Sequence, residues 1–190
     1  MNKKVSILYG MSGTLKSTIS NNYLGYSIMD SNNDYNECYT DLWKSIPKDP
    51  LIYVDSSALL ANHYSNIKQA LRYEDSILVG RGLLDYYFWN YHQVGLSMEV
   101  SPILELESKL FTGCEVNRIL LINESDKLMD SIEKDDKSSR KFDRLNYKKL
   151  QNQYVDLIID NYSNAKVMWI NDDNIDEIIK EVSQLINYGK

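Results

Sequence analysis

Residues 10–18 read Gly10-Met11-Ser12-Gly13-Thr14-Leu15-Lys16-Ser17-Thr18. The apolar run at residues 5–9 predicts a buried strand before this stretch. A helix is predicted at residues 16–24, so that it begins at the last three residues of the stretch. A strand, a glycine-containing turn, a Lys-Ser pair and a helix, in this order, are typical of the phosphate-binding loop of nucleotide-dependent enzymes. The alternative is an ordinary glycine-rich turn that carries a surface lysine.

The residue types in this stretch suit a polyphosphate. Glycines let the backbone wrap closely around the anion, so that several N–H groups point inward. Lys16 would neutralise charge on the outer phosphates, and the Ser17 hydroxyl would bind Mg²⁺. Leu15 departs from the usual pattern, because a glycine is expected just before the lysine. The predicted nucleotide-binding residues are Gly10, Ser12, Gly13, Thr14, Leu15, Lys16, Ser17 and Thr18.

Composition favours a globular protein with one domain over residues 1–190. Hydrophobic residues make up 43% of the chain and charged residues 25%. The net charge of −6 disfavours a protein that coats nucleic acid. No apolar run approaches the roughly 20 residues of a membrane-spanning helix.

Cys38 and Cys114 lie far apart without metal-ligand spacing, which favours a reducing compartment, and we expect a cytoplasmic protein. The sequence is compatible with a homodimer and does not fix the oligomeric state.

Strand patterns alternate with helix patterns along the chain. This alternation predicts an α/β fold with a parallel sheet and helices on both faces. Residues 51–55 fit either a strand or the start of a long helix to Tyr73, and the spacing downstream favours the helix. The predicted strands are 5–9, 26–29, 76–79, 118–123 and 166–171. The predicted helices are 16–24 with Gly25 as its C-cap, 51–73, 85–91, 98–111, 125–132, one with an apolar stripe of Leu145, Leu150, Tyr154, Leu157 and Ile158, and 173–188.

Two charged residues follow predicted strands. Asp30 comes at the end of the second strand, and Arg81 follows the third. The carboxyl ends of parallel strands face the ligand crevice in such sheets. A guanidinium there can hold a phosphate group of a second substrate, the acceptor of a phosphoryl group, through two hydrogen bonds. This is the role predicted for Arg81. A structural salt bridge of Arg81 with Asp30 or Asp55 is the alternative.

Residues 124–143 form a charged segment that we expect to act as a lid. Phosphoryl transfer requires cations around the transferring group and exclusion of water, and a closing segment with arginines supplies both. Arg140 in this segment and Arg144 just after it are the candidates. A solvated charged face is the alternative. The loop at 31–47, with one short helix, is a second candidate lid or a plain connection.

Taken together, these features resemble the thymidylate kinase branch of the nucleoside monophosphate kinases, nearly from end to end. The resemblance rests on the loop at 10–18, the long helix at 51–71, the strand and arginine at 77–82, and the strand, lid and helix at 119–158. It implies a three-layer P-loop kinase fold with a five-stranded parallel sheet and an arginine-bearing lid. Four residues depart from the family pattern. Leu15 replaces a glycine, Gly80 replaces an aspartate, Ser56 stands where the family often has an arginine, and Ser12 stands where many members carry an acidic or charged residue.

The resemblance implies Mg²⁺- and ATP-dependent phosphoryl transfer to a deoxynucleoside monophosphate. The implied catalytic residues are Lys16, Asp30, Arg81, Arg140 and Arg144. Related deoxynucleoside kinases use a carboxylate after the second strand as a base, and Asp30 stands in a suitable place for that role. A deoxynucleoside kinase is therefore the nearest alternative. A kinase acting on nucleic-acid ends or modified bases and a nucleotide-binding module without turnover are more distant ones. Tyr86, Phe88 and Trp89 are candidates for stacking on the acceptor base.

Overall fold

The computed structural model describes residues 2–28, 51–94, 99–134 and 144–187, with only the helical backbone described for 51–59 and 89–94. Its five strands form one sheet in the order β2-β3-β1-β4-β5. The expectations of an α/β fold and a five-stranded parallel sheet are confirmed. No helix in the described part of the chain is both long and apolar enough to span a membrane. The strands are β1 (Lys3–Tyr9), β2 (Tyr26–Ile28), β3 (Ser76–Val79), β4 (Cys114–Asn123) and β5 (Lys166–Ile170).

The chain divides into two compact units. The first comprises Met1–Val5 and Gly25–Val116, and the second comprises Ser6–Leu24 and Asn117–Lys190. The expectation of a single domain over 1–190 stays a prediction.

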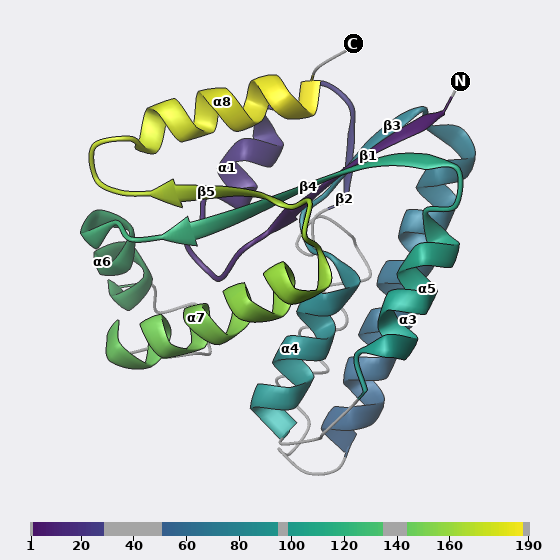
Figure 1. The fold of residues 1–190 in the computed structure, drawn as a ribbon, viewed down its shortest axis with the longest axis horizontal. Coiled ribbons are helices and arrows are strands. Elements are labelled where there is room, and N and C mark those ends of the chain that lie inside the picture. Colours follow the sequence, from purple (N-terminus) through teal and green to yellow (C-terminus); the bar gives the residue numbers. More distant parts are fainter. Residues whose placement is uncertain (1, 29–50, 95–98, 135–143, 188–190) are drawn as a thin grey trace. The chain divides into compact units, whose positions relative to one another are not determined.

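In the first unit, β2 pairs with β3 in parallel, with Tyr26 opposite Ile77 and Ile28 opposite Val79. Helix α3 (Leu51–Tyr73) packs against β3 and against α4 (Leu83–Val94), and α4 packs in turn against α5 (Ser101–Leu110) (Figure 1). Residues 51–55 therefore belong to a helix, as the spacing downstream of them indicates. The second lid candidate, at 31–47, lies outside the described residues.

In the second unit, β4 pairs with β5 in parallel over Ile119–Asn123 and Lys166–Ile170. Helix α8 (Ile175–Asn187) packs against β5 and α1 (Lys16–Asn21), and α7 (Arg144–Asn161) lies across the other face of these strands (Figure 1). Helix α6 (Asp126–Lys134) follows β4 directly. These helices are where the sequence predicts them, with ends shifted by a few residues.

Helix α1 ends earlier than expected. It stops at Asn21 rather than at Leu24, and Asn22 caps it in a right-handed conformation, so Gly25 is not the cap. The side chain of Asn187 on α8 accepts a hydrogen bond from the Leu24 N–H at 3.0 Å and donates one to the Asn22 carbonyl at 3.2 Å. The N–H groups of Asn22 and Tyr23 bind the carbonyls of Ile19 and Ser20 locally. The two further hydrogen bonds come from a residue more than 160 positions away, which local sequence does not reveal.

The buried face of α7 also differs from the predicted stripe. Leu145 is 82% exposed, whereas the buried positions are Tyr147, Gln151, Tyr154 and Ile158. Their spacing of four, three and four residues is that of one helix face. The prediction was wrong about Leu145 because the apolar residue type was taken as the signal, while the buried face carries a glutamine and two tyrosines.

Two adjacent isoleucines on α7 test this assignment. Ile158 is fully buried and Ile159 is 44% exposed. We expect Ile158→Ala to lower the free energy of unfolding by about 2–5 kcal/mol, because it leaves a cavity. Ile159→Ala should change it by less than about 0.5 kcal/mol. Urea unfolding of both variants measures the difference, and equal losses would contradict the assigned face.

Candidate functional site

The loop between β1 and α1 requires glycine at two positions. Gly10 has a φ of +153° and Gly13 a φ of +76°. A Cβ atom on Gly10 would lie 2.8 Å from the carbonyl oxygen of Leu121 and closer still to the Thr14 hydroxyl. A Cβ atom on Gly13 would overlap the side chain of Ile132 on α6. Gly10 therefore excludes a side chain by sterics against the backbone as well as by its φ, whereas at Gly13 the positive φ is the main restriction, because the Ile132 side chain can move.

Leu15 adopts a left-handed backbone conformation, at the position where the sequence motif usually has a glycine. Its φ is 62° and its ψ is 7°, and it immediately precedes the first residue of α1. A left-handed residue followed by a right-handed one turns successive N–H groups toward a common concavity, a backbone nest that binds anions. Ile19 N–H donates to the Leu15 carbonyl at 2.9 Å. The N–H groups of Ser17 and Thr18, in the first turn of α1, lie ahead of this first helical bond.

The Lys16 side chain folds back across the loop. Its ammonium donates to the carbonyls of Gly10 and of Met11, the latter at 2.9 Å, and lies 3.3 Å from the Thr14 hydroxyl. The buried Thr14 hydroxyl itself donates to the Met11 carbonyl at 2.8 Å. The cation therefore sits over the loop backbone, where it can neutralise a phosphate held there.

Ser17 is exposed at the first turn of α1. One hydroxyl is a suitable protein contribution for Mg²⁺, which usually keeps several waters and binds substrate phosphates in addition to one or two protein oxygens. Within the described ranges, no group of three or more His, Cys, Asp or Glu side chains is placed to hold a metal ion. The donor set at the loop thus fits an ion held mainly by phosphate.

Helix α7 supports the loop through its buried polar face. The Tyr154 hydroxyl accepts a hydrogen bond from the Gly10 N–H at 3.2 Å, and the Tyr147 hydroxyl donates to the Ser12 carbonyl at 2.8 Å. Between them, Gln151 makes two 2.9 Å hydrogen bonds with the backbone N–H and carbonyl of Asn123 at the end of β4. The sequence prediction missed Tyr147 and Gln151, although the 147, 151, 154, 158 spacing could have indicated them.

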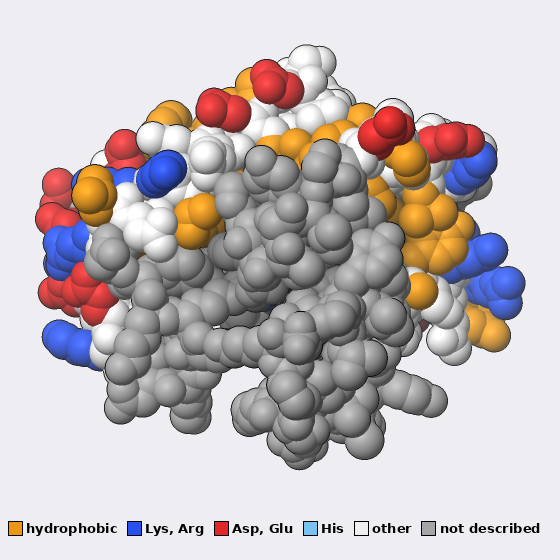
Figure 2. Space-filling model, turned by 90° about the horizontal axis from the view of Figure 1, so that it is seen from below, with side chains coloured by type: hydrophobic (Ala, Val, Ile, Leu, Met, Phe, Trp, Pro, Cys, Tyr) orange, Lys and Arg blue, Asp and Glu red, His pale blue; other side chains and the backbone are white. Residues whose placement is uncertain are grey.

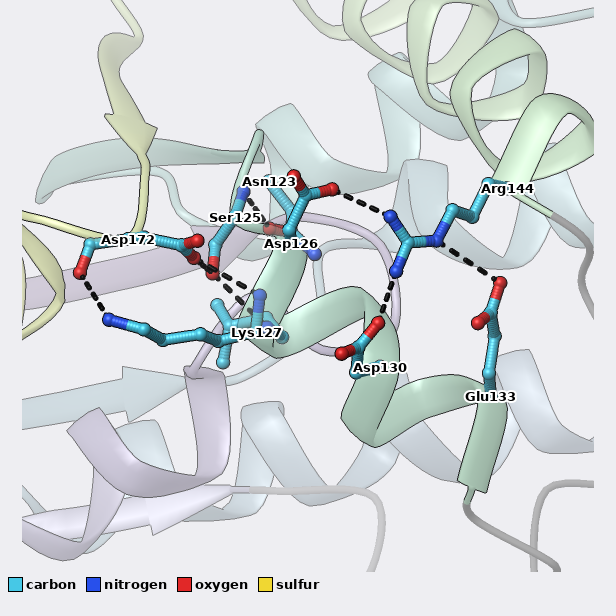
Figure 3. Close-up of polar contacts among 9 residues, drawn as sticks. Asn123, Ser125, Asp126, Lys127, Asp130, Glu133, Arg144 and Asp172 are labelled. Atoms are coloured by element: carbon cyan, nitrogen blue, oxygen red, sulfur yellow. Dashed lines mark hydrogen bonds and ion pairs between the residues drawn. The ribbon is translucent and has the colours of Figure 1, made fainter.

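Arg144, a predicted catalytic residue, is paired with three carboxylates of α6 (Figure 3). Its guanidinium lies 2.7 Å from Asp126 Oδ1 and 3.4 Å from Glu133 Oε1, and it also donates to Asp130. Partial desolvation opposes its charged form, but Glu133, Asp130 and Asp126 outweigh this effect and raise the pKa of Arg144. The guanidinium is half exposed, so these pairs are open to competition from salt or from a stronger anion.

The start of α6 is fixed by Asp172, which follows β5 (Figure 3). Its carboxylate accepts hydrogen bonds from the Ser125 hydroxyl and from the Lys127 N–H, the latter at 3.1 Å. The Ser125 hydroxyl accepts in turn from the Leu128 N–H at 3.1 Å, which makes it the helix cap. The hydrogen bond from Ser125, aided by that from Lys127, lowers the pKa of Asp172.

In the first unit, Arg81 follows β3 as predicted. Its carbonyl lies 2.8 Å from Nε2 of the buried His63 on α3, whose ring packs on Tyr86 at 5.2 Å between centroids. Asp85, also buried, accepts a hydrogen bond from the Gly82 N–H at 2.7 Å and so stabilises the start of α4. Of the candidate stacking rings, Phe88 is buried and Tyr86 half buried.

The remaining predicted residues lie outside the described ones. These are Asp30 and Arg140, and no side-chain placement is described for Asp55, Ser56 or Trp89. On the described part of the face in Figure 2, acidic and basic side chains are interspersed.

The left-handed conformation of Leu15 can be tested by stability, because here glycine should be more stabilising than alanine, the reverse of the usual order. For a non-glycine residue this conformation costs roughly 1–2 kcal/mol. Leu15→Gly and Leu15→Ala remove the same side-chain contacts, but only glycine relieves the backbone. We expect the glycine variant to be more stable than the alanine variant by about 0.5–1 kcal/mol in urea unfolding. An alanine variant as stable as or more stable than the glycine variant would contradict the assigned conformation.

Comparison with known proteins places the fold. No protein-family model matches the chain, and no curated protein sequence matches it. Among solved structures, it is similar to a deoxyadenosine kinase from M. mycoides, with a TM-score of 0.57, 20% identity and 96% of each chain covered. It is also similar to the thymidylate kinase of Ehrlichia chaffeensis, with a TM-score of 0.56, 14% identity and 98% and 97% covered.

A third similar structure is the thymidylate kinase of Candida albicans, with a TM-score of 0.62, 8% identity and 97% and 91% covered. All three likenesses extend over nearly the whole of both chains. The chain therefore has the fold that deoxyadenosine kinases and thymidylate kinases share, the three-layer P-loop kinase fold.

Proposed function

We propose that the protein is a kinase that transfers the γ-phosphoryl group of ATP to a deoxynucleoside monophosphate. The observation that carries this proposal is the loop at 10–18. Its backbone holds left-handed conformations at Gly13 and Leu15, and the Lys16 ammonium folds over it. Such a loop binds phosphates through backbone N–H groups and one cation. The fold shared with deoxyadenosine and thymidylate kinases supports the same reaction class.

In the proposed reaction, an acceptor oxygen forms a bond to the γ-phosphorus while the bond to the bridging oxygen breaks. ADP then leaves with the electron pair. Lys16 stabilises the charge that develops on the phosphates, and Ser17 contributes one oxygen ligand to Mg²⁺, whose role is to neutralise and orient the phosphates. Arg81 holds the acceptor phosphate, and Asp30 serves as a base or metal-organising carboxylate.

Arg140 and Arg144 complete the proposed set. Arg144 is engaged by three carboxylates of α6. To contribute to transfer, its guanidinium would exchange at least one carboxylate for a phosphate oxygen, a replacement of one anion by a more highly charged one. Because the pairs are half exposed, this exchange requires no burial of an unpaired charge. We place the reaction in the cytoplasm, where ATP and nucleotide acceptors are available, and retain the homodimer as a proposal.

A deoxynucleoside acceptor is the second candidate. The similar M. mycoides structures are deoxyadenosine kinases, one of them with the products dCMP and a flexible dCDP bound. In this alternative, Asp30 would take the proton of the sugar hydroxyl. The two candidates share the phosphate loop and differ in the group that accepts the phosphoryl.

Lys16 provides the first test. We expect Lys16→Ala to lower phosphoryl transfer by at least about a hundredfold, because one preorganised charge is removed from the transferring group. Lys180→Ala, which removes an exposed lysine of α8, should retain the wild-type rate. Transfer of labelled phosphate from ATP measures both. Unchanged transfer by the Lys16 variant would refute the assigned site.

The acceptor provides the second test. We expect labelled ATP to phosphorylate a deoxynucleoside monophosphate in a panel that also contains deoxynucleosides and oligonucleotides. Product on deoxynucleosides alone would establish the second candidate. Product on oligonucleotides alone would refute both candidates, and nucleotide binding without any product would identify a binding module.

A further inference from the structure

We propose that Tyr147 is a positioning residue that fixes the peptide between Ser12 and Gly13, so that the Gly13 N–H donates to a phosphate of the bound nucleotide. This inference rests on the proposed function and assigns one donor within the phosphate loop. The Tyr147 hydroxyl comes from α7, 135 residues away in sequence, and donates to the Ser12 carbonyl at 2.8 Å.

The orientation follows from the geometry of the peptide bond. In a trans peptide the carbonyl and the following N–H point in opposite directions. The described residues contain no cis peptide bond. Since the Ser12 carbonyl is held toward α7 by Tyr147, the Gly13 N–H must point away from α7. The hydrogen bond therefore prevents a flip of this peptide that would present a carbonyl oxygen, rather than an N–H, to an anion.

A second contact restricts the same peptide. Gly13 lies in the left-handed region, and the side chain of Ile132 on α6 occupies the space that a Cβ atom would fill. The peptide is thus held at its carbonyl by α7, while the Ile132 side chain of α6 lies beside the next α-carbon. A peptide held in this way before the ligand arrives needs little reorganisation to bind it.

The hydroxyl of Tyr147 is suited to a permanent donor role. The side chain is fully buried, and burial raises the pKa of Tyr147, although the Asn123 side chain opposes this shift. The phenol therefore keeps its proton at physiological pH. A carbonyl oxygen can only accept a hydrogen bond, so this proton is the one that holds the Ser12 carbonyl.

Tyr154 has the opposite hydrogen-bond role. Its hydroxyl accepts from the Gly10 N–H, which ties that N–H to α7. The two tyrosines, which lie on one face of α7, therefore orient two loop peptides in opposite ways. Tyr154 turns an N–H toward α7, and Tyr147 turns a carbonyl toward α7. Only the second leaves an N–H directed away from the helix, where an anion can reach it.

The test compares Tyr147→Phe with Tyr162→Phe. The first removes only the hydroxyl that holds Ser12. The second removes a hydroxyl just beyond α7, on a ring that packs against Tyr9 and Arg118. We expect Tyr147→Phe to weaken binding of a non-hydrolysable ATP analogue by about tenfold in calorimetry, the effect of losing one oriented donor. The control should bind as the wild type does.

Nuclear magnetic resonance separates orientation from general stability. In the wild type, the Gly13 amide proton should shift downfield when the analogue binds, and in Tyr147→Phe this shift should shrink at saturating analogue. A wild-type Gly13 resonance that does not respond to the analogue overturns the inference without any variant. An equal shift in both proteins also overturns it, even if affinity falls, because Tyr147 would then act on stability alone. A wild type that binds no nucleotide would overturn the proposed function and this inference with it.

Discussion

A backbone binds a polyphosphate where its N–H groups converge, and a loop of this kind needs left-handed residues beside right-handed ones for that convergence. The described loop meets this requirement at Gly13, where glycine makes it nearly free, and at Leu15, where the side chain makes it costly. A leucine there indicates that the concavity of the loop overrides the local preference of the residue. The contacts that surround the loop must therefore stabilise a conformation that its own sequence disfavours.

Helix α7 supplies much of that stabilisation. Tyr154 and Tyr147 bind the backbone at Gly10 and Ser12, and Gln151 binds both backbone groups of Asn123 at the end of β4. Each such hydrogen bond contributes roughly 0.5–1.5 kcal/mol. Together they are of the size needed to offset the left-handed leucine. One helix face thus couples the phosphate loop to the strand beside it, and the buried polar side chains are explained by the groups that they hold.

The charged residues near the loop follow a different logic. Lys16 is bound to loop carbonyls, and Arg144 is bound to carboxylates of α6. Carbonyl oxygens carry only partial charge and are weak competitors for a lysine against a phosphate. Three carboxylates are stronger competitors for an arginine, although solvent exposure weakens them. In the proposed enzyme, Lys16 would therefore meet the nucleotide at a smaller electrostatic cost than Arg144.

The sequence by itself determined the glycine-containing loop at 10–18 between a strand and a helix, the alternation of strands and helices, and the long helix through Tyr73. These features depend on local chemistry, namely turn residues at fixed spacing and the periodicity of apolar side chains. It also placed Arg81 just beyond the end of β3, because the end of a strand can be predicted from the apolar run that forms it.

Only the tertiary structure decided which face of α7 is buried, where α1 ends and which groups bind Arg144. Leu145 is exposed while Tyr147 and Gln151 are buried. The buried face is the one whose polar side chains can form hydrogen bonds with the backbone of the loop and of β4. Helix α1 stops at Asn21, and Asn187 holds the chain beyond it through two hydrogen bonds. Each of these outcomes depends on a hydrogen bond or ion pair between residues far apart in the chain, and no local pattern encodes such a contact.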